Sequence, residues 1–312
     1  MRNYVFGPVP SRRLGISLGV DLTPNKTCSY DCLYCQLSKT RLLTSKRDRF
    51  CPAQDVIKEL KEVLDEIAPP DWITFSGTGE PTLHLDIGLI IREIKKFCSS
   101  PVCVITNSSL LHLPEVQNDL LTADKILPTL TTVFEETYKR IHRPTENLTC
   151  KTMLRGLKEF SGKFGGEIEI EIFVCPGFND SDREITGLRN YISSLANIRS
   201  IYLNTAVRVP LEGEIITAEP RSLELFKDKL QLDLPVYNAF ERQAIPRKAS
   251  DWRRKATKED VFKLLMRHPC SVAQLSKVLD SQEETIQGFL QELLEQKKVK
   301  QLKNKEWTIV EA

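Results

Sequence analysis

Hydrophobic residues follow two different repeats along the first 230 positions of this chain. Six short apolar runs have the length and composition of buried strands, and they cover residues 15–22, 72–76, 102–106, 125–130, 167–174 and 200–204. Apolar residues also recur at helical spacing over residues 53–68, 87–97, 148–160, 182–195 and 221–230. This order predicts six βα units, which build a parallel sheet with helices outside it.

Six βα units are fewer than the eight of a closed barrel, so a partial barrel and an open doubly wound sheet both fit. In either fold, ligands gather at the C-terminal ends of the strands. Glu167, Glu169 and Glu171 alternate with apolar residues on one predicted strand. They point either into an open barrel or outward to solvent at a sheet edge, and the first arrangement is favoured because parallel strands are usually covered on both faces.

The pattern changes near the C-terminus. Three helices are predicted over residues 258–267, 272–278 and 283–296, and two alternating runs at 299–302 and 306–310 resemble a hairpin. Three helices followed by a hairpin is the winged-helix pattern, a variant of the helix-turn-helix. We therefore expect a core domain over residues 1–235, a linker over 236–254 and a winged-helix-like domain over 255–312.

Composition narrows the class of protein. The 312 residues are 41% hydrophobic and 28% charged, which excludes a disordered, collagen-like or disulfide-stapled chain. No apolar run reaches the roughly 18 residues of a membrane span, and the first residues lack a signal-peptide segment. We therefore expect a cytoplasmic protein without a membrane partner, in which nine cysteines serve as thiols or metal ligands rather than disulfides.

Charge is unevenly distributed, although the formal net charge is only +2. Residues 1–49 hold 9 Lys and Arg against 3 Asp and Glu, so this segment either attracts an anionic cofactor or substrate or forms a solvated surface. Arg12 and Arg13 within it either face an anion or form surface ion pairs. Residues 250–312 hold 12 Lys and Arg against 10 Asp and Glu, which is too weak an excess to indicate DNA binding.

Three of the nine cysteines fall within eight residues. Cys28, Cys32 and Cys35 have the spacing C-x3-C-x2-C, directly after the first predicted strand. Three thiolates can hold three irons of a [4Fe–4S] cluster and leave the fourth iron open to a substrate-derived ligand, whereas electron-transfer clusters take four cysteines. The alternatives are a zinc site or three buried thiols. His142, at a predicted helix-to-loop junction, is expected to cap or to pack.

This cysteine pattern, with Tyr34 before the last thiol, resembles the signature of the radical S-adenosylmethionine (SAM) superfamily. The segment Gly77-Thr78-Gly79-Glu80 ends the second predicted strand and resembles the Gly-Gly-Glu loop of that family, with a threonine between the glycines. Within the superfamily, residues 6–15 and 26–32 are similar to a group of Fe–S oxidoreductases near the wybutosine-synthesis enzymes. The resemblance covers about residues 5–235 and implies a partial (β/α)6 barrel.

The resemblance also implies cofactors and ligands. It implies a [4Fe–4S] cluster on the three cysteines and SAM on a set of cofactor-binding residues, namely Gly77, Thr78, Gly79, Glu80, Asn107, Ser108 and Tyr34. Glu80 is expected to serve SAM rather than the fold. No catalytic residue is implied beyond the cluster site. An external one-electron reductant of flavodoxin or ferredoxin type would drive reductive cleavage of SAM to a 5′-deoxyadenosyl radical, which abstracts hydrogen from a substrate.

Three interpretations of the substrate and the function fit the sequence. The leading interpretation is a radical SAM enzyme that acts on an RNA or other macromolecule reached through the C-terminal domain. A second interpretation is an enzyme that modifies or activates a protein or peptide. A third, from a different class, is a non-catalytic Fe–S regulator that binds DNA. Glu80 and the full set of βα units disfavour the regulator, because a sensor needs no SAM pocket.

Overall fold

One large sheet organises the first 241 residues of the computed structural model, which describes residues 3–23, 26–37, 39–206, 216–241, 256–267, 270–279, 281–302 and 305–310. Eight strands follow the order β1-β2-β5-β6-β7-β8-β9-β10. Their bounds are β1 (Val5–Ser11), β2 (Gly15–Val20), β5 (Trp72–Phe75), β6 (Val102–Thr106), β7 (Lys125–Pro128), β8 (Glu167–Phe173), β9 (Ile198–Asn204) and β10 (Val236–Asn238). Every pair is parallel except β1 with β2.

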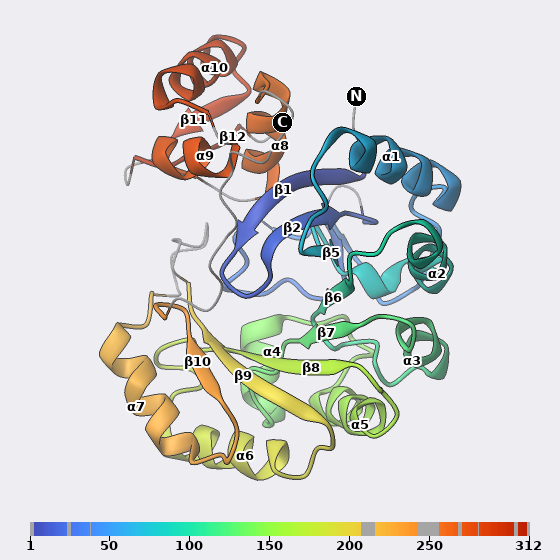
Figure 1. The fold of residues 1–312 in the computed structure, drawn as a ribbon. Coiled ribbons are helices and arrows are strands. Elements are labelled where there is room, and N and C mark those ends of the chain that lie inside the picture. The colour runs from blue at the N-terminus through green and yellow to red at the C-terminus, as the bar shows by residue number, and fades with distance from the viewer. Residues whose placement is uncertain are drawn as a thin grey trace.

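Helices cover the outer face of this sheet, as Figure 1 shows. They are α1 (Ala53–Glu66), α2 (Ile87–Phe97), α3 (Pro114–Leu120), α4 (Glu135–His142), α5 (Cys150–Ser161), α6 (Asp182–Ile192) and α7 (Pro220–Leu230), with a 3-10 turn η1 (Pro81–Leu83). Their apolar sides join the strands in one continuous core, because β2 and nearly all of β8 are buried on both faces. The predicted α/β fold of six βα units is confirmed as a curved parallel sheet.

Two strands of the large sheet and two of its helices lie outside the sequence prediction. β1 contains Pro8, Pro10 and Gly7, which discourage a strand assignment, but an edge strand tolerates proline because its outer side needs no ladder hydrogen bonds. α3 and α4 are short and polar. β10 extends the sheet to Asn238, so residues 236–238 belong to the sheet rather than to the expected linker. Residues 242–254 of that linker lie outside the described residues.

The C-terminal segment has the predicted order of elements. It contains α8 (Lys258–Arg267), α9 (Val272–Leu279), α10 (Glu283–Glu295) and an antiparallel pair, β11 (Val299–Gln301) with β12 (Trp307–Ile309). Apolar residues from all three helices and β11 close a second core that is separate from the first. α8 and α9 contact β1, and Val9 of that strand packs against this second core (Figure 1). Among the described residues, no helix combines the length and the apolar character that crossing a bilayer requires.

Candidate functional site

The three clustered cysteines lie together in the loop after β2. Cys28 ends the short strand β3 (Thr27–Cys28), which pairs in parallel with β4 (Leu42–Leu43). All three thiols are free and partly buried. Burial raises the pKa of Cys28 to about 12, with a smaller contribution from Cys35. Burial also raises the pKa of Cys32, and both other thiols add to the effect. The three sulfurs are therefore close enough to interact, and a bound cation would be needed to hold them as thiolates.

Three thiols are the donor set of a [4Fe–4S] cluster with one open iron. Among the described residues, no three His, Cys, Asp or Glu side chains are arranged around one metal position. A [4Fe–4S] cluster binds each cysteine through a different iron, so its ligands stand farther apart. Lys26 supports an anionic occupant: its Nζ is buried without a hydrogen-bond partner in the described part of the chain. Its charge lowers the pKa of Cys28 and Cys32.

The glycine-rich loop after β5 packs directly against the cysteine loop. A Cβ atom on Gly79 would lie 1.8 Å from the Thr27 carbonyl oxygen, so only glycine permits this approach. The Glu80 backbone N–H donates to the same oxygen at 3.1 Å. On the other side, Asp21 at the end of β2 accepts a hydrogen bond from the Thr78 N–H at 2.9 Å. Gly77 to Glu80 are therefore held beside the first cysteine of the loop, and sequence reasoning missed the part that Asp21 plays.

Glu80 has several hydrogen-bond partners within the fold. Its side chain is 2% exposed, and Oε1 accepts hydrogen bonds from the Thr82 backbone N–H and from the hydroxyls of Thr82 and Thr106 at 2.6–3.1 Å. Oε2 accepts from the Asn107 backbone N–H at 2.7 Å. Burial raises the pKa of this carboxyl, whereas these hydrogen bonds oppose the change. The carboxylate thus joins the ends of β5 and β6, and its expected role toward SAM stays a prediction.

We therefore expect Glu80→Ala to destabilise the protein by about 2–4 kcal/mol, because it leaves several buried donors without an acceptor. The midpoint of chemical unfolding, followed by circular dichroism, measures this loss. Glu62→Ala is the matched control, since Glu62 is an exposed carboxylate on α1 that lies 4.0 Å from Lys58. A Glu80→Ala variant as stable as the control would show that the four hydrogen bonds contribute little to the fold.

The other expected SAM ligands divide into two groups. Asn107 lies beside the cysteine loop, with Nδ2 2.9 Å from Ser29 Oγ and 3.6 Å from Cys28 Sγ. Tyr34 stacks on Phe173 at the end of β8, with ring centroids 3.9 Å apart. Ser108 instead donates its hydroxyl to the Thr129 carbonyl at 2.9 Å and is fully buried, so the structure gives it a partner within the fold. Its φ of +67° fits a turn that carries Asn107 toward the cysteines.

A residue far along the chain reaches the same loop. His142 ends α4, and its Nδ1 lies 3.2 Å from Cys32 Sγ. The carbonyls of Ile141 and His142 accept the backbone N–H groups of Leu33 and Asp31, each at 2.9 Å. Burial lowers the pKa of His142 to about 3. The expected packing role is therefore accompanied by a direct contact with a cysteine 110 residues away, which no local sequence signal could indicate.

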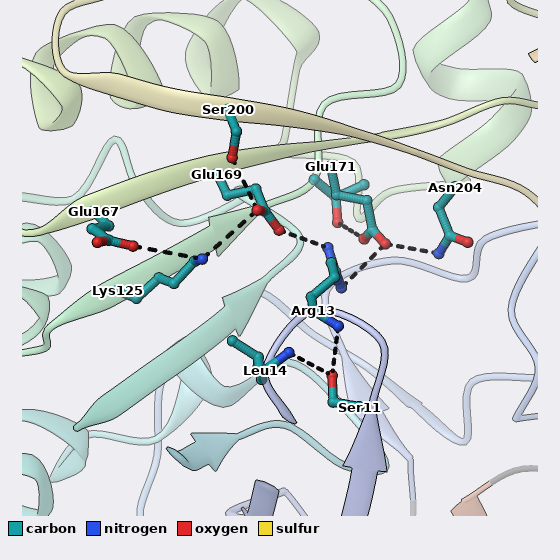
Figure 2. A network of polar contacts seen from close by, with 10 residues as sticks. Ser11, Arg13, Leu14, Lys125, Glu167, Glu169, Glu171, Ser200 and Asn204 are labelled. Atoms are coloured by element: carbon teal, nitrogen blue, oxygen red, sulfur yellow. Dashed lines mark hydrogen bonds and ion pairs between the residues drawn. The ribbon is translucent and has the colours of Figure 1, made fainter. Parts of the chain in front are cut away.

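The barrel interior carries charge, as Figure 2 shows. Glu169 accepts a hydrogen bond from Ser200 at 2.9 Å, and Glu171 accepts one from Asn204 at 2.8 Å. Arg13 lies 3.8 Å from Glu169 and 3.5 Å from Glu171. The inward orientation is thus correct for Glu169 and Glu171, whereas Glu167 at the start of β8 is exposed.

The inward carboxylates of β8 share a strand face with a residue that contacts the cysteine loop. Residues 169, 171 and 173 share one face of β8, because side chains alternate along a strand. Phe173 is the next inward side chain after Glu171, and it stacks on Tyr34 beside Cys35. The β1–β2 hairpin closes the open side of the sheet, since Arg13 enters the interior and Arg12 donates to the Ala239 carbonyl at 2.5 Å. Arg13 therefore faces buried carboxylates rather than forming a surface pair.

The fold and the site define a parallel β/α protein with a three-cysteine iron–sulfur loop at the C-terminal end of its sheet. Residues 22–187 match the family model described as the radical SAM superfamily, and this span includes the three cysteines and the Gly77–Glu80 loop. A UPF0026 protein of Synechocystis sp. is 35% identical over 217 residues, which cover 68% of this chain and 78% of that protein. The chain belongs to the radical SAM superfamily and to the same family as the UPF0026 proteins.

Two further comparisons concern a longer relative and a solved structure of low sequence identity. A protein called GTPase Obg from Brachyspira hyodysenteriae is 35% identical over 297 residues. This alignment covers 95% of the present chain but only 43% of that protein, so the chain spans less than half of that relative. The structure of TYW1 with a lysine-pyruvate adduct bound has a TM-score of 0.52 and 17% identity, over 73% of this chain and 76% of that chain. The shared feature is the fold.

Membership of the superfamily has direct consequences. It implies an enzyme of the radical SAM type with a [4Fe–4S] cluster and SAM as cofactors. The structure is consistent with this set, because the three cysteines, the glycine-rich loop and an unpaired buried ammonium lie together. The sequence-based assignment of the superfamily and of the fold is therefore confirmed.

Proposed function

We propose that this chain binds one [4Fe–4S] cluster through Cys28, Cys32 and Cys35 and cleaves SAM reductively. The observation that carries the proposal is the contact between the two loops, in which Gly79 and Glu80 meet the Thr27 carbonyl beside Cys28. When bound, the cluster and SAM supply one-electron cleavage of a sulfonium carbon–sulfur bond, with a 5′-deoxyadenosyl radical that takes hydrogen from a substrate.

In this proposal, residues of the chain bind the cofactors, orient them and shield them from water. The backbone of Gly77 to Gly79 lies at the strand end, where an amino group of the cofactor can be hydrogen-bonded. Asn107 positions an amide beside Cys28, and Lys26 offsets negative charge at the same place. The ring pair of Tyr34 and Phe173 covers the interior side of the loop, which limits access of water to the reacting centre.

We assign the chain a macromolecular substrate. The interior below the cysteine loop is polar, and Glu169 Oε1 and Arg13 Nη1 are buried there without hydrogen-bond partners among the described residues. The strongest contacts of the C-terminal module with the barrel run from α8 and α9 to β1, so we expect α10 and the hairpin to be the part that receives a substrate. Exposed lysines at the hairpin favour an RNA, since phosphate contacts dominate nucleic-acid affinity; they are Lys297, Lys298, Lys300 and Lys305.

A protein or peptide substrate is the second candidate, and one observation favours it. The exposed face of α10 is acidic, because Glu283, Glu284 and Glu295 are exposed, while Glu292 pairs with Lys258 of α8. The third helix of a winged-helix domain reads the groove of a duplex, and an acidic helix is repelled by phosphates. An acidic helix beside a basic hairpin suits a charged protein surface instead.

An external one-electron donor of flavodoxin or ferredoxin type completes the proposed reaction. None of the nine cysteines takes part in a disulfide, and thiols that stay reduced support a location in the cytoplasm. The non-catalytic DNA-binding regulator is the remaining alternative. It would hold a cluster as well, but it would not consume SAM.

Anaerobic reconstitution tests the proposal. Purified protein is loaded with iron and sulfide, reduced with dithionite and incubated with SAM, and 5′-deoxyadenosine is measured by liquid chromatography. We expect formation of 5′-deoxyadenosine that depends on both the cluster and the reductant. Protein that carries a full cluster but leaves SAM intact would contradict the enzyme and favour the regulator. Modified nucleosides and peptides are then compared between cells with and without the protein, which separates the two substrate classes.

A further inference from the structure

The contact between His142 and the cysteine loop is more specific than packing requires. His142 Nδ1 lies 3.2 Å from Cys32 Sγ, and its Nε2 lies 2.5 Å from the Thr131 hydroxyl. Both ring nitrogens therefore have a polar partner in the interior of the protein. The imidazole is 2% exposed, so no solvent competes for either contact.

The surroundings hold the ring in one orientation. Three tyrosines surround the imidazole, with ring centroids at 4.7 Å for Tyr30, 5.3 Å for Tyr138 and 5.9 Å for Tyr34. The hydroxyl of Tyr138 donates to that of Tyr30 at 2.8 Å, which fixes two of these rings against each other. The backbone of α4 is anchored as well, because the His142 carbonyl accepts the Asp31 N–H. The cysteine loop and the ring therefore move as one unit.

The direction of the hydrogen bond follows from the chemistry of the sulfur. A cysteine that ligates iron is a thiolate, which carries no proton and can only accept. Nδ1 of His142 must then carry the ring proton, and Nε2 accepts from the Thr131 hydroxyl. This arrangement is one donor-to-acceptor chain from Thr131 through His142 to Cys32: the thiolate sets the tautomer, and the Thr131 hydroxyl, which can donate or accept, donates to Nε2.

We propose that His142 is a positioning residue that donates a hydrogen bond to the Cys32 sulfur and thereby raises the reduction potential of the cluster. The physical reason is electrostatic: reduction adds one negative charge to the cluster, and an N–H dipole directed at a ligand sulfur stabilises the more negative state. The proposal rests on the proposed function, because it requires a [4Fe–4S] cluster on the three cysteines. It assigns Thr131 the task of donating to Nε2, which strengthens Nδ1–H as a donor.

The test is the midpoint potential of the reconstituted cluster without SAM, from a redox titration followed by electron paramagnetic resonance. His142→Phe keeps an aromatic ring among the tyrosines and removes the N–H, so the potential is expected to move to a more negative value. His142→Asn is expected to stay near wild type, because its amide N–H takes the place of Nδ1. Thr131→Val is expected to shift the potential in the same direction as His142→Phe, since Nδ1–H becomes a weaker donor when no hydroxyl donates to Nε2.

His112→Phe is the matched control, because His112 directs its Nδ1 to the Ser109 carbonyl at 2.9 Å and has no contact with a cluster cysteine. Its potential is expected to be unchanged. A wild-type potential in His142→Phe with full iron content would overturn the proposal and leave His142 a packing residue. If His142→Phe loses its iron, an unshifted Thr131→Val variant would overturn it instead. Failure of the proposed function has a different signature, since wild-type protein would then hold no [4Fe–4S] cluster to titrate.

Discussion

Replacement of Cys28, Cys32 and Cys35 together by alanine is expected to abolish iron binding, from about four irons per chain to almost none. The expectation follows from the donor set, since only these three thiols interact with one another beside the Gly77–Glu80 loop among the described residues. Four of the other cysteines are buried within the hydrophobic clusters of the fold and are expected to serve packing, namely Cys51, Cys103, Cys150 and Cys175.

Iron and acid-labile sulfide, measured after anaerobic reconstitution, decide this prediction. The matched control replaces Cys98, Cys150 and Cys270, which lie apart from the loop, and it should retain full iron content. Circular dichroism establishes that both triple variants are folded. Retention of about four irons by the first variant would mean that another set of residues holds the metal, and the cluster assignment would be lost.

The parallel core of the fold was predictable because its physical signal is local. Short runs rich in apolar residues and bounded by turns mark strands that are covered on both faces, and β2 and β6 lie where those runs do. β1 carries the opposite signal. Its two prolines reduce hydrogen bonding on one side, and only a position at the sheet edge makes them acceptable, which depends on the finished sheet rather than on the segment.

The candidate site was predictable in part for the same reason. The cysteine spacing and the glycines of the Gly77–Glu80 loop are short-range patterns with a strict chemical or steric cause. The direction of the Glu80 side chain is not such a pattern, since it depends on hydroxyls and an N–H that follow β5 and β6. His142 is a stronger example, because α4 must fold back across the sheet before it can meet Cys32.

Removal of the C-terminal module is expected to leave SAM cleavage intact and to lower conversion of the substrate. The module has its own apolar core and contacts the barrel at β1, whereas the cysteines and the Gly77–Glu80 loop lie in the first core domain. A chain ending at residue 250 should therefore bind its cluster and cleave SAM without substrate at rates near wild type. Conversion of the macromolecular substrate should fall by about tenfold or more, equivalent to about 1.4 kcal/mol of lost positioning.

The measurement pairs an assay in vitro with product levels in cells that carry the truncated chain as their only copy. Val9→Asp in the full chain is the matched variant, because it places a carboxylate against the module's core without removing any element. It should lower product formation while cluster content and 5′-deoxyadenosine formation stay near wild type. A truncated chain that cannot hold its cluster would place the module within the barrel's folding unit. Unchanged product levels would show that the barrel finds its substrate alone, since the surface on α10 and the hairpin would then contribute no binding energy to the reaction.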